Sequence, residues 1–240
     1  MKSRDLPAQL TLPGFGAIAA FLVAAIQALA SVVYLLLPAN LRVGAPGAQL
    51  LPAYHRDPGL LSLEFILLAL VGVIGLAVIP AVSALVGSRE NGLLRWAATL
   101  ATVGYAVSAV SHLVEAARLP KIADAYVAGD ASTKAVLAPI WRSSLDLYSL
   151  WQFTAVGIWI VVASALALRN QRFRWLAYFG LVVGVLYCLT PISVIQLNSA
   201  LLNTLVAVLG IGLATIWYVW MGLELWRAAR QGVQAQTNRR

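Results

Sequence analysis

The sequence predicts an all-α protein, a polytopic membrane bundle of six transmembrane helices with two long outer loops and short inner turns. Six apolar stretches have about 20 or more residues each, and a helix of that length reaches about 30 Å, the thickness of the hydrocarbon layer. Hydrophobic residues make up 61% of the chain and charged residues 11%, against roughly 25% charged in a soluble domain. A soluble chain of 240 residues has no core large enough to hide six helices that are apolar on all sides.

The six stretches follow one another along a single domain that spans residues 1–240. They are Gly14–Leu37, Leu60–Val86, Leu93–Val114, Leu147–Leu168, Phe173–Ile192 and Leu201–Leu225. In the first, Ala28-Leu29-Ala30 is typical of a signal cleavage site. The apolar run nevertheless continues to Leu37 and reaches full spanning length, so we expect an uncleaved helix.

Short connections and small residues indicate how the helices pack. Residues 87–92 and 169–172 are tight turns, which force the helices on either side to be antiparallel neighbours. Gly180 and Gly184 form a GxxxG pair, and Gly104 with Ser108 forms a similar pair. Small residues at this spacing allow close helix approach, and we interpret both pairs as contacts within the chain.

The two long loops differ from each other. Pro38–Gly59 contains four prolines and three glycines, a spacing that predicts turns and extended segments without a regular helix. Leu119–Ile140 is predicted to hold a short helix over Pro120–Ala128, because proline suits a first helical turn. A second short helix would be capped by Asp130 or Ser132 and stopped by Pro139.

The distribution of positive charge predicts the orientation. With both termini inside, eleven Lys and Arg residues lie on the inner side and six on the outer side, as the positive-inside rule requires. Trp96, Trp175 and Trp226 would lie at the inner ends of helices, where their rings favour the headgroup level. We interpret the net charge of +8 as a topology signal and a contact with anionic lipid, and we expect no nucleic-acid partner.

Polar residues at membrane depth are costly and therefore mark candidate sites. Under the predicted topology several of them fall at the outer boundary of the membrane. Tyr105, Ser108, His112 and Glu115 share one helix face because they are three or four residues apart. The candidate ligand-binding residues are Glu64, Tyr105, Ser108, His112, Glu115 and Asp146.

This cluster has two interpretations. It can form an outward-facing polar pocket for a ligand, an ion or a metal, or its members can be hydrated helix ends that pair with Arg118 and Arg142. His112 and Glu115 are the candidate metal ligands, although a zinc site needs about three. A serine hydrolase would require a poised serine, and Ser108 and Ser111 lie on the same helix as His112 without a nucleophile turn.

The remaining polar residues favour structural roles. Gln27, Gln152 and Asn203 are typical of hydrogen bonds between helices. No continuous file of carboxylates crosses the membrane, which argues against a proton pump. The single cysteine, Cys188, can form no intrachain disulfide.

Two runs resemble a known group of proteins. They are Trp159–Arg169 with Arg172–Gly184, and Ala125–Asp130 followed by Leu145-Asp146. They are similar to a broad family of uncharacterised six-helix bacterial integral membrane proteins. The resemblance implies a bacterial cytoplasmic membrane and no known activity, and it supplies no catalytic residue.

The leading hypothesis is a non-catalytic protein that binds a lipophilic molecule or serves as an accessory subunit of a membrane complex. The alternatives are a small-solute transporter with an outward-facing polar vestibule and a metal-dependent intramembrane hydrolase. We expect the lipid bilayer as a partner and no cofactor; a membrane-protein complex is a candidate partner, and a bound lipid is a candidate ligand.

Overall fold

The computed structural model describes residues 11–42, 44–87, 91–141, 149–195 and 199–237. These residues form helices and connections, and none of them lies in a β-strand. Six helices are long and apolar enough to cross a membrane, which confirms the predicted all-α class. They are α1 (Leu12–Leu36), α3 (Gly59–Val86), α4 (Gly92–Ala128), α6 (Leu150–Arg169), α7 (Arg174–Ile195) and a continuous last helix built from α8 (Ser199–Leu205), the π-helical η3 (Val206–Leu213) and α9 (Ala214–Thr237).

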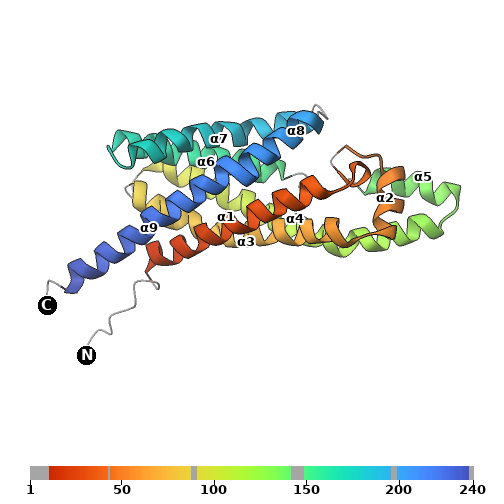
Figure 1. Ribbon diagram of the computed structural model, residues 1–240, viewed down its shortest axis with the longest axis horizontal. Coiled ribbons are helices and arrows are strands. Elements are labelled where there is room, and N and C mark those ends of the chain that lie inside the picture. Colours follow the sequence, from red (N-terminus) through yellow and green to blue (C-terminus); the bar gives the residue numbers. More distant parts are fainter. Residues whose placement is uncertain (1–10, 43, 88–90, 142–148, 196–198, 238–240) are drawn as a thin grey trace.

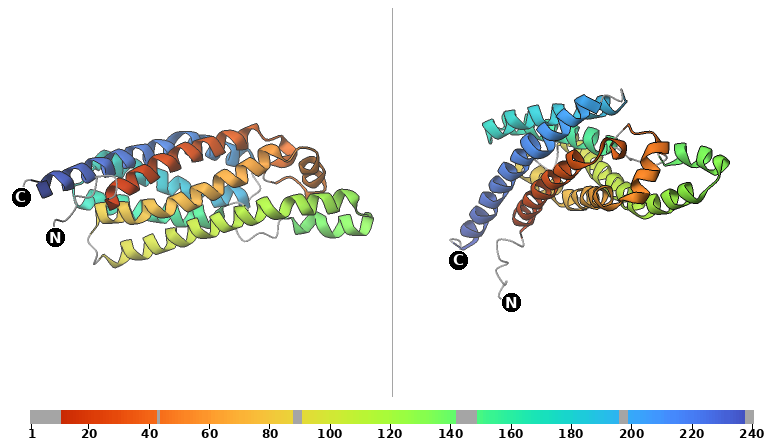
Figure 2. Two further views of the ribbon diagram at one scale, coloured as in Figure 1. Left: turned by 90° about the horizontal axis from the view of Figure 1, so that it is seen from below. Right: turned by 45° about the vertical axis from the view of Figure 1, so that its right-hand side comes forward.

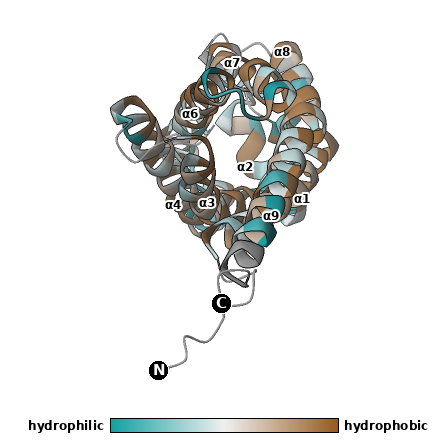
Figure 3. Ribbon diagram, turned by 90° about the vertical axis from the view of Figure 1, so that its left-hand side faces the viewer, coloured by the Kyte–Doolittle hydropathy of each residue, from teal (hydrophilic) through white to brown (hydrophobic). Residues whose placement is uncertain are grey.

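The long helices form a closed ring. Neighbours pack in the order α1, α3, α4, α6 and α7, and α9 with η3 returns to α1 to close it (Figure 1 and Figure 3). The packing of α7 against α9 is the sparsest part of the ring. Large apolar side chains such as Phe15, Val73 and Trp175 are exposed on the outside, as expected for helices surrounded by lipid.

The two ends of the bundle differ. The first residues of α1 and the last of α9 lie at one end, and the short helices α2 (Gly47–Arg56) and α5 (Ala131–Ile140) lie at the other (Figures 1 and 2). The connection from α6 to α7 is on the terminal side, where Asn170 and Arg172 donate hydrogen bonds to the carbonyl oxygens of Val86 and Leu85 at the end of α3.

The prediction that Pro38–Gly59 lacks a regular helix is wrong. Helix α2 contains Pro52 at its sixth position, although a proline removes one backbone hydrogen bond. Burial of Leu50, Leu51 and Tyr54 against α4 and α5 offsets that loss. Gly47 permits the contact, because a Cβ there would lie 2.0 Å from the carbonyl oxygen of Ala138.

The separate helix predicted over Pro120–Ala128 is also wrong, because these residues continue α4 without interruption. Leu119 and Ala123 are fully buried, and Tyr126 is 9% exposed, in the apolar cluster that also contains α2. That packing holds the chain helical across Pro120. The second short helix forms as predicted with Asp130 as its N-cap, but the predicted stop at Pro139 is wrong, because α5 continues through Pro139 to Ile140. Hydrogen bonds from the Thr133 amide and from Ser132 lower the pKa of Asp130 to about 2.

Close packing fills the terminal half of the bundle. Trp159 and Trp217 are fully buried and meet edge to face, with ring centroids 6.1 Å apart. The GxxxG pair packs within the chain, as interpreted from the sequence: a Cβ at Gly180 would lie 2.8 Å from Trp217 Nε1 of α9, and one at Gly184 would lie 2.8 Å from the Gly157 carbonyl oxygen of α6. This half of the bundle is therefore closely packed, and a pocket between Ala163, Leu176 and Met221 measures only about 10 Å³.

Candidate functional site

A cavity of about 110 Å³ lies inside the ring. Residues of α1, α3, α4, α6, α7, α8 and η3 line it, and it lies in the half of the bundle nearer α2 and α5, since Glu64 is five residues from the start of α3. Most of its wall is apolar, from residues such as Leu68, Val71 and Leu205. A cavity of about 150 Å³ holds a benzene molecule, so this one accommodates a group slightly smaller than an aromatic ring.

Glu64 provides the carboxyl group of the cavity. Its side chain is 9% exposed, and that remaining surface faces the space that it lines. Within the described part of the chain, no side chain or backbone group forms a hydrogen bond or an ion pair with it. A buried carboxyl group without a partner is costly, which makes Glu64 a candidate for contact with a ligand.

His112 lies in the same wall and has a defined hydrogen-bonding state. Its Nδ1 is 2.7 Å from the carbonyl oxygen of Ser108, and a carbonyl oxygen only accepts, so Nδ1 carries the proton. In the neutral ring, Nε2 is then the acceptor. It lies 3.4 Å from the Oγ of Ser149.

Ser149 is the functional candidate that sequence reasoning missed. It is 3% exposed, lines the cavity and immediately precedes α6. Its backbone is left-handed, with φ 55° and ψ 30°, which is uncommon for a residue other than glycine. A Ser at a helix start signals only an N-cap, and its distance from His112, 37 residues earlier in the chain, becomes visible only in three dimensions.

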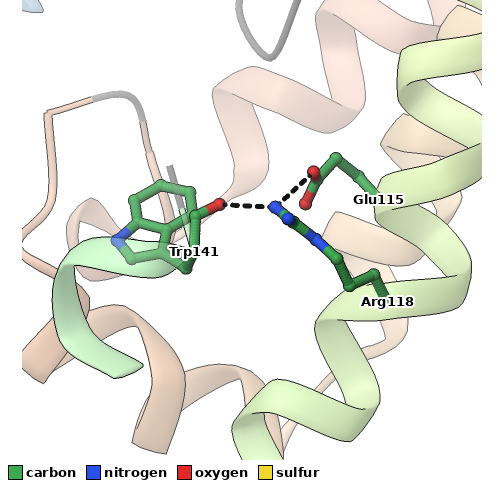
Figure 4. A network of polar contacts seen from close by, with 3 residues as sticks. All are labelled: Glu115, Arg118 and Trp141. Carbon is green, nitrogen blue, oxygen red and sulfur yellow. Dashed lines mark hydrogen bonds and ion pairs between the residues drawn. The ribbon is translucent and has the colours of Figure 1, made fainter. Parts of the chain in front are cut away.

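Glu115 is buried but lies outside the cavity lining. One of its oxygens accepts a 2.7 Å hydrogen bond from Arg118, whose guanidinium also donates to the carbonyl oxygen of Trp141 at 3.2 Å (Figure 4). This network joins α4 to the end of α5. The pairing of helix-end charges with Arg118, the second interpretation of the cluster, therefore applies to Glu115.

The other predicted site residues are distributed as follows. Ser108 is fully buried behind His112, with its Oγ 3.2 Å from Nδ1. Tyr105 lies deeper, where its hydroxyl forms a hydrogen bond with that of Tyr218, and it does not line the cavity. Asp146 and its predicted partner Arg142 lie outside the described residues.

Amide and hydroxyl groups complete the polar lining. Gln27 donates a 2.6 Å hydrogen bond from Nε2 to the Tyr187 hydroxyl, a bond between α1 and α7 of the kind predicted from the sequence. Ser31 packs closely against Gly210, because a Cβ added to Gly210 would lie only 1.8 Å from the Ser31 Oγ. The π-helical turns of η3 bring Gly210 into the wall, and such turns occur frequently at functional sites.

Metal binding gains no geometric support from the described side chains. No three His, Cys, Asp or Glu residues among them lie close enough together to hold an ion. The two candidate metal ligands have different surroundings, since His112 lines the cavity and Glu115 is paired with Arg118.

Comparison with known proteins gives one match. A family model described as "Domain of unknown function (DUF4386)" matches residues 18–223, which include all six long helices in whole or in part. No curated protein and no solved structure matches the chain.

Proposed function

We propose that this protein, which belongs to the DUF4386 family, binds a small lipophilic molecule whose polar end enters the cavity and contacts Glu64. The observation that carries the proposal is a largely apolar cavity with one buried carboxyl group that has no protein partner among the described residues. Binding pockets combine apolar walls with a few polar groups in this way. An ammonium or hydroxyl group of the ligand would satisfy the carboxyl group.

Glu64→Gln should weaken binding of a cationic probe at least about tenfold, because a hydrogen bond to a charged group contributes about 1.5–3 kcal/mol. Benzylamine and benzyl alcohol are suitable probes, since the aminomethyl or hydroxymethyl end of each is smaller than a ring and carries one donor group that can enter the cavity. Binding is measured in mild detergent as the rise in unfolding temperature with probe concentration. Benzyl alcohol should bind wild type and variant alike.

Glu224→Gln is the matched control, because Glu224 is a glutamate on α9 that pairs with Arg227 and is remote from the cavity lining. It should leave the affinity for benzylamine unchanged. Equal affinity of wild type and Glu64→Gln for benzylamine would contradict the proposal. Native mass spectrometry of the purified wild type provides a second measurement, in which we expect a retained lipophile.

We place the protein in a bacterial cytoplasmic membrane with both termini in the cytoplasm. The eleven-to-six distribution of Lys and Arg supports this orientation, together with the exposed Trp96 and Trp175 near the terminal end. Association with a larger membrane complex, in which the protein would be an accessory subunit, is a further proposal from the sequence.

Labelling with a membrane-impermeant thiol reagent tests the orientation. In a Cys188→Ala background, Ser132→Cys on α5 should react in intact cells, and Gln231→Cys on α9 should react only after lysis. Both residues are exposed, and α5 lies at the opposite end of the bundle from the C-terminal end of α9 (Figure 1). If only Gln231→Cys reacted in intact cells, the protein would have the opposite orientation to the one proposed.

A carrier of small solutes is the second candidate. Glu64 and His112, two members of the predicted polar vestibule, line the same cavity. A carrier would move benzylamine into proteoliposomes at a rate that depends on Glu64, whereas a binding protein would only retain it.

A further inference from the structure

Ser149 occupies a helix start without performing the usual function of a serine there. Serine is among the preferred N-cap residues because its hydroxyl accepts from the first turn, yet the Ser149 side chain forms no capping hydrogen bond. Its left-handed backbone is strained for a residue with a Cβ, and such strain gathers at functional sites. The hydroxyl instead lies in the cavity wall next to His112 Nε2.

His112 is oriented as a general base requires. The Ser108 carbonyl oxygen fixes the proton on Nδ1 and leaves the lone pair of Nε2 directed at the Ser149 hydroxyl. A nucleophile, a base within hydrogen-bond reach and a third group that orients the base form the arrangement of an activated serine. The 3.4 Å separation is slightly longer than the upper limit of about 3.2 Å for that reach, and catalytic hydrogen bonds of this kind often shorten in the complex with substrate.

We propose that Ser149 and His112 form a nucleophile–base pair that cleaves an ester or thioester bond of the molecule bound in the cavity. This inference rests on the proposed function, since it acts on the bound lipophile. It departs from the expectation of a non-catalytic protein, which depended on the absence of any catalytic constellation in the sequence.

The first half of the reaction forms an acyl-enzyme. Ser149 Oγ attacks the carbonyl carbon while His112 Nε2 takes the hydroxyl proton. The bond from that carbon to the leaving oxygen or sulfur then breaks, and Nε2–H returns the proton to the leaving alcohol or thiol. The N-terminal end of α6, which begins next to Ser149, favours the negative charge that develops on the carbonyl oxygen.

Water completes the cycle. His112 Nε2 takes a proton from a water molecule, whose oxygen attacks the acyl carbon. The bond to Ser149 Oγ breaks, the carboxylic acid leaves, and Nε2–H restores the hydroxyl proton to Ser149. Ser108 acts in both halves as a positioning residue through its backbone carbonyl oxygen.

Diisopropyl fluorophosphate tests the pair, because it reacts with activated serines: the Oγ–P bond forms, the P–F bond breaks, and fluoride and a proton leave. We expect wild type to gain one adduct, located at Ser149 by mass spectrometry of peptides. Ser149→Gly should gain none, and glycine suits the left-handed backbone, so this variant should fold. His112→Gln should react at least about 100-fold more slowly, since general bases contribute about that much or more.

Ser164→Ala is the control. Ser164 is a buried serine on α6 outside the cavity lining, so this variant should react like wild type. Loss of the adduct in Ser164→Ala, or an adduct on another serine, would overturn the assignment of the nucleophile.

Turnover and binding measurements separate this inference from the proposed function. Wild type should bind benzylamine and hydrolyse p-nitrophenyl butyrate, and Ser149→Gly should not hydrolyse the ester. Normal benzylamine binding with neither adduct nor hydrolysis in wild type would overturn the catalytic pair and leave the binding function standing. A wild type that reacts at Ser149 but binds no benzylamine would sustain the pair and contradict the role of Glu64.

Discussion

Arg118→Met should destabilise the protein by about 3–5 kcal/mol, the usual cost of removing one partner of a buried ion pair. The Glu115 side chain is fully buried, and its ion pair with Arg118 is 2.7 Å long (Figure 4). The same substitution removes the bond from Arg118 to the Trp141 carbonyl oxygen, so α5 should also lose one of its contacts with α4. Unfolding of the detergent-solubilised protein by heat or denaturant measures the effect.

A double variant and a control sharpen this test. Glu115→Gln combined with Arg118→Met removes both charges and should recover most of the lost stability, since replacing both partners is often close to neutral. Lys121→Met removes an exposed cation from the same helix and should change stability by less than about 0.5 kcal/mol. Equal losses in the single and double variants would show that the ion pair is not the source.

Gly184→Ala should destabilise the protein by about 1–3 kcal/mol, the usual cost of extra atoms in a well-packed interior. A Cβ at Gly184 would lie 2.8 Å from the Gly157 carbonyl oxygen and 3.0 Å from the Val161 amide nitrogen. Both are backbone atoms of α6, so α6 and α7 have to separate. Thermal unfolding in detergent measures the loss.

Gly92→Ala is the matched control. A Cβ at Gly92, the first residue of α4, would meet nothing within 4 Å. The stability of the Gly92→Ala protein should therefore stay within about 0.5 kcal/mol of wild type. A Gly184→Ala protein as stable as the Gly92→Ala protein would contradict the close approach of α6 and α7.

The elements that sequence patterns predicted well are those with one dominant physical signal. Apolar length alone identified the long helices, since no other environment accepts a helix that is apolar on every side. The errors fall at prolines. Pro52 and Pro120 lie inside helices, although proline by itself tends to interrupt a helix. Burial of neighbours such as Leu51 and Leu119 offsets that tendency.

The candidate site divides in the same way. Helical spacing placed Ser108, His112 and Glu115 on one face, but it could not show that His112 lines the cavity while Glu115 pairs with Arg118. Helix geometry alone decides that side chains three or four residues apart share one face. Which neighbour that face meets depends on helices that are distant in the sequence.

The sequence by itself determined the membrane class, the number of spans and the residues whose polarity is costly at that depth, because these properties depend on local composition and length. The tertiary structure alone decided that α9 closes the ring against α1, that Glu64 and His112 share a cavity, and that Ser149 lies beside His112. Those relations join residues far apart in the chain, and only the packing of the helices sets the distances between them.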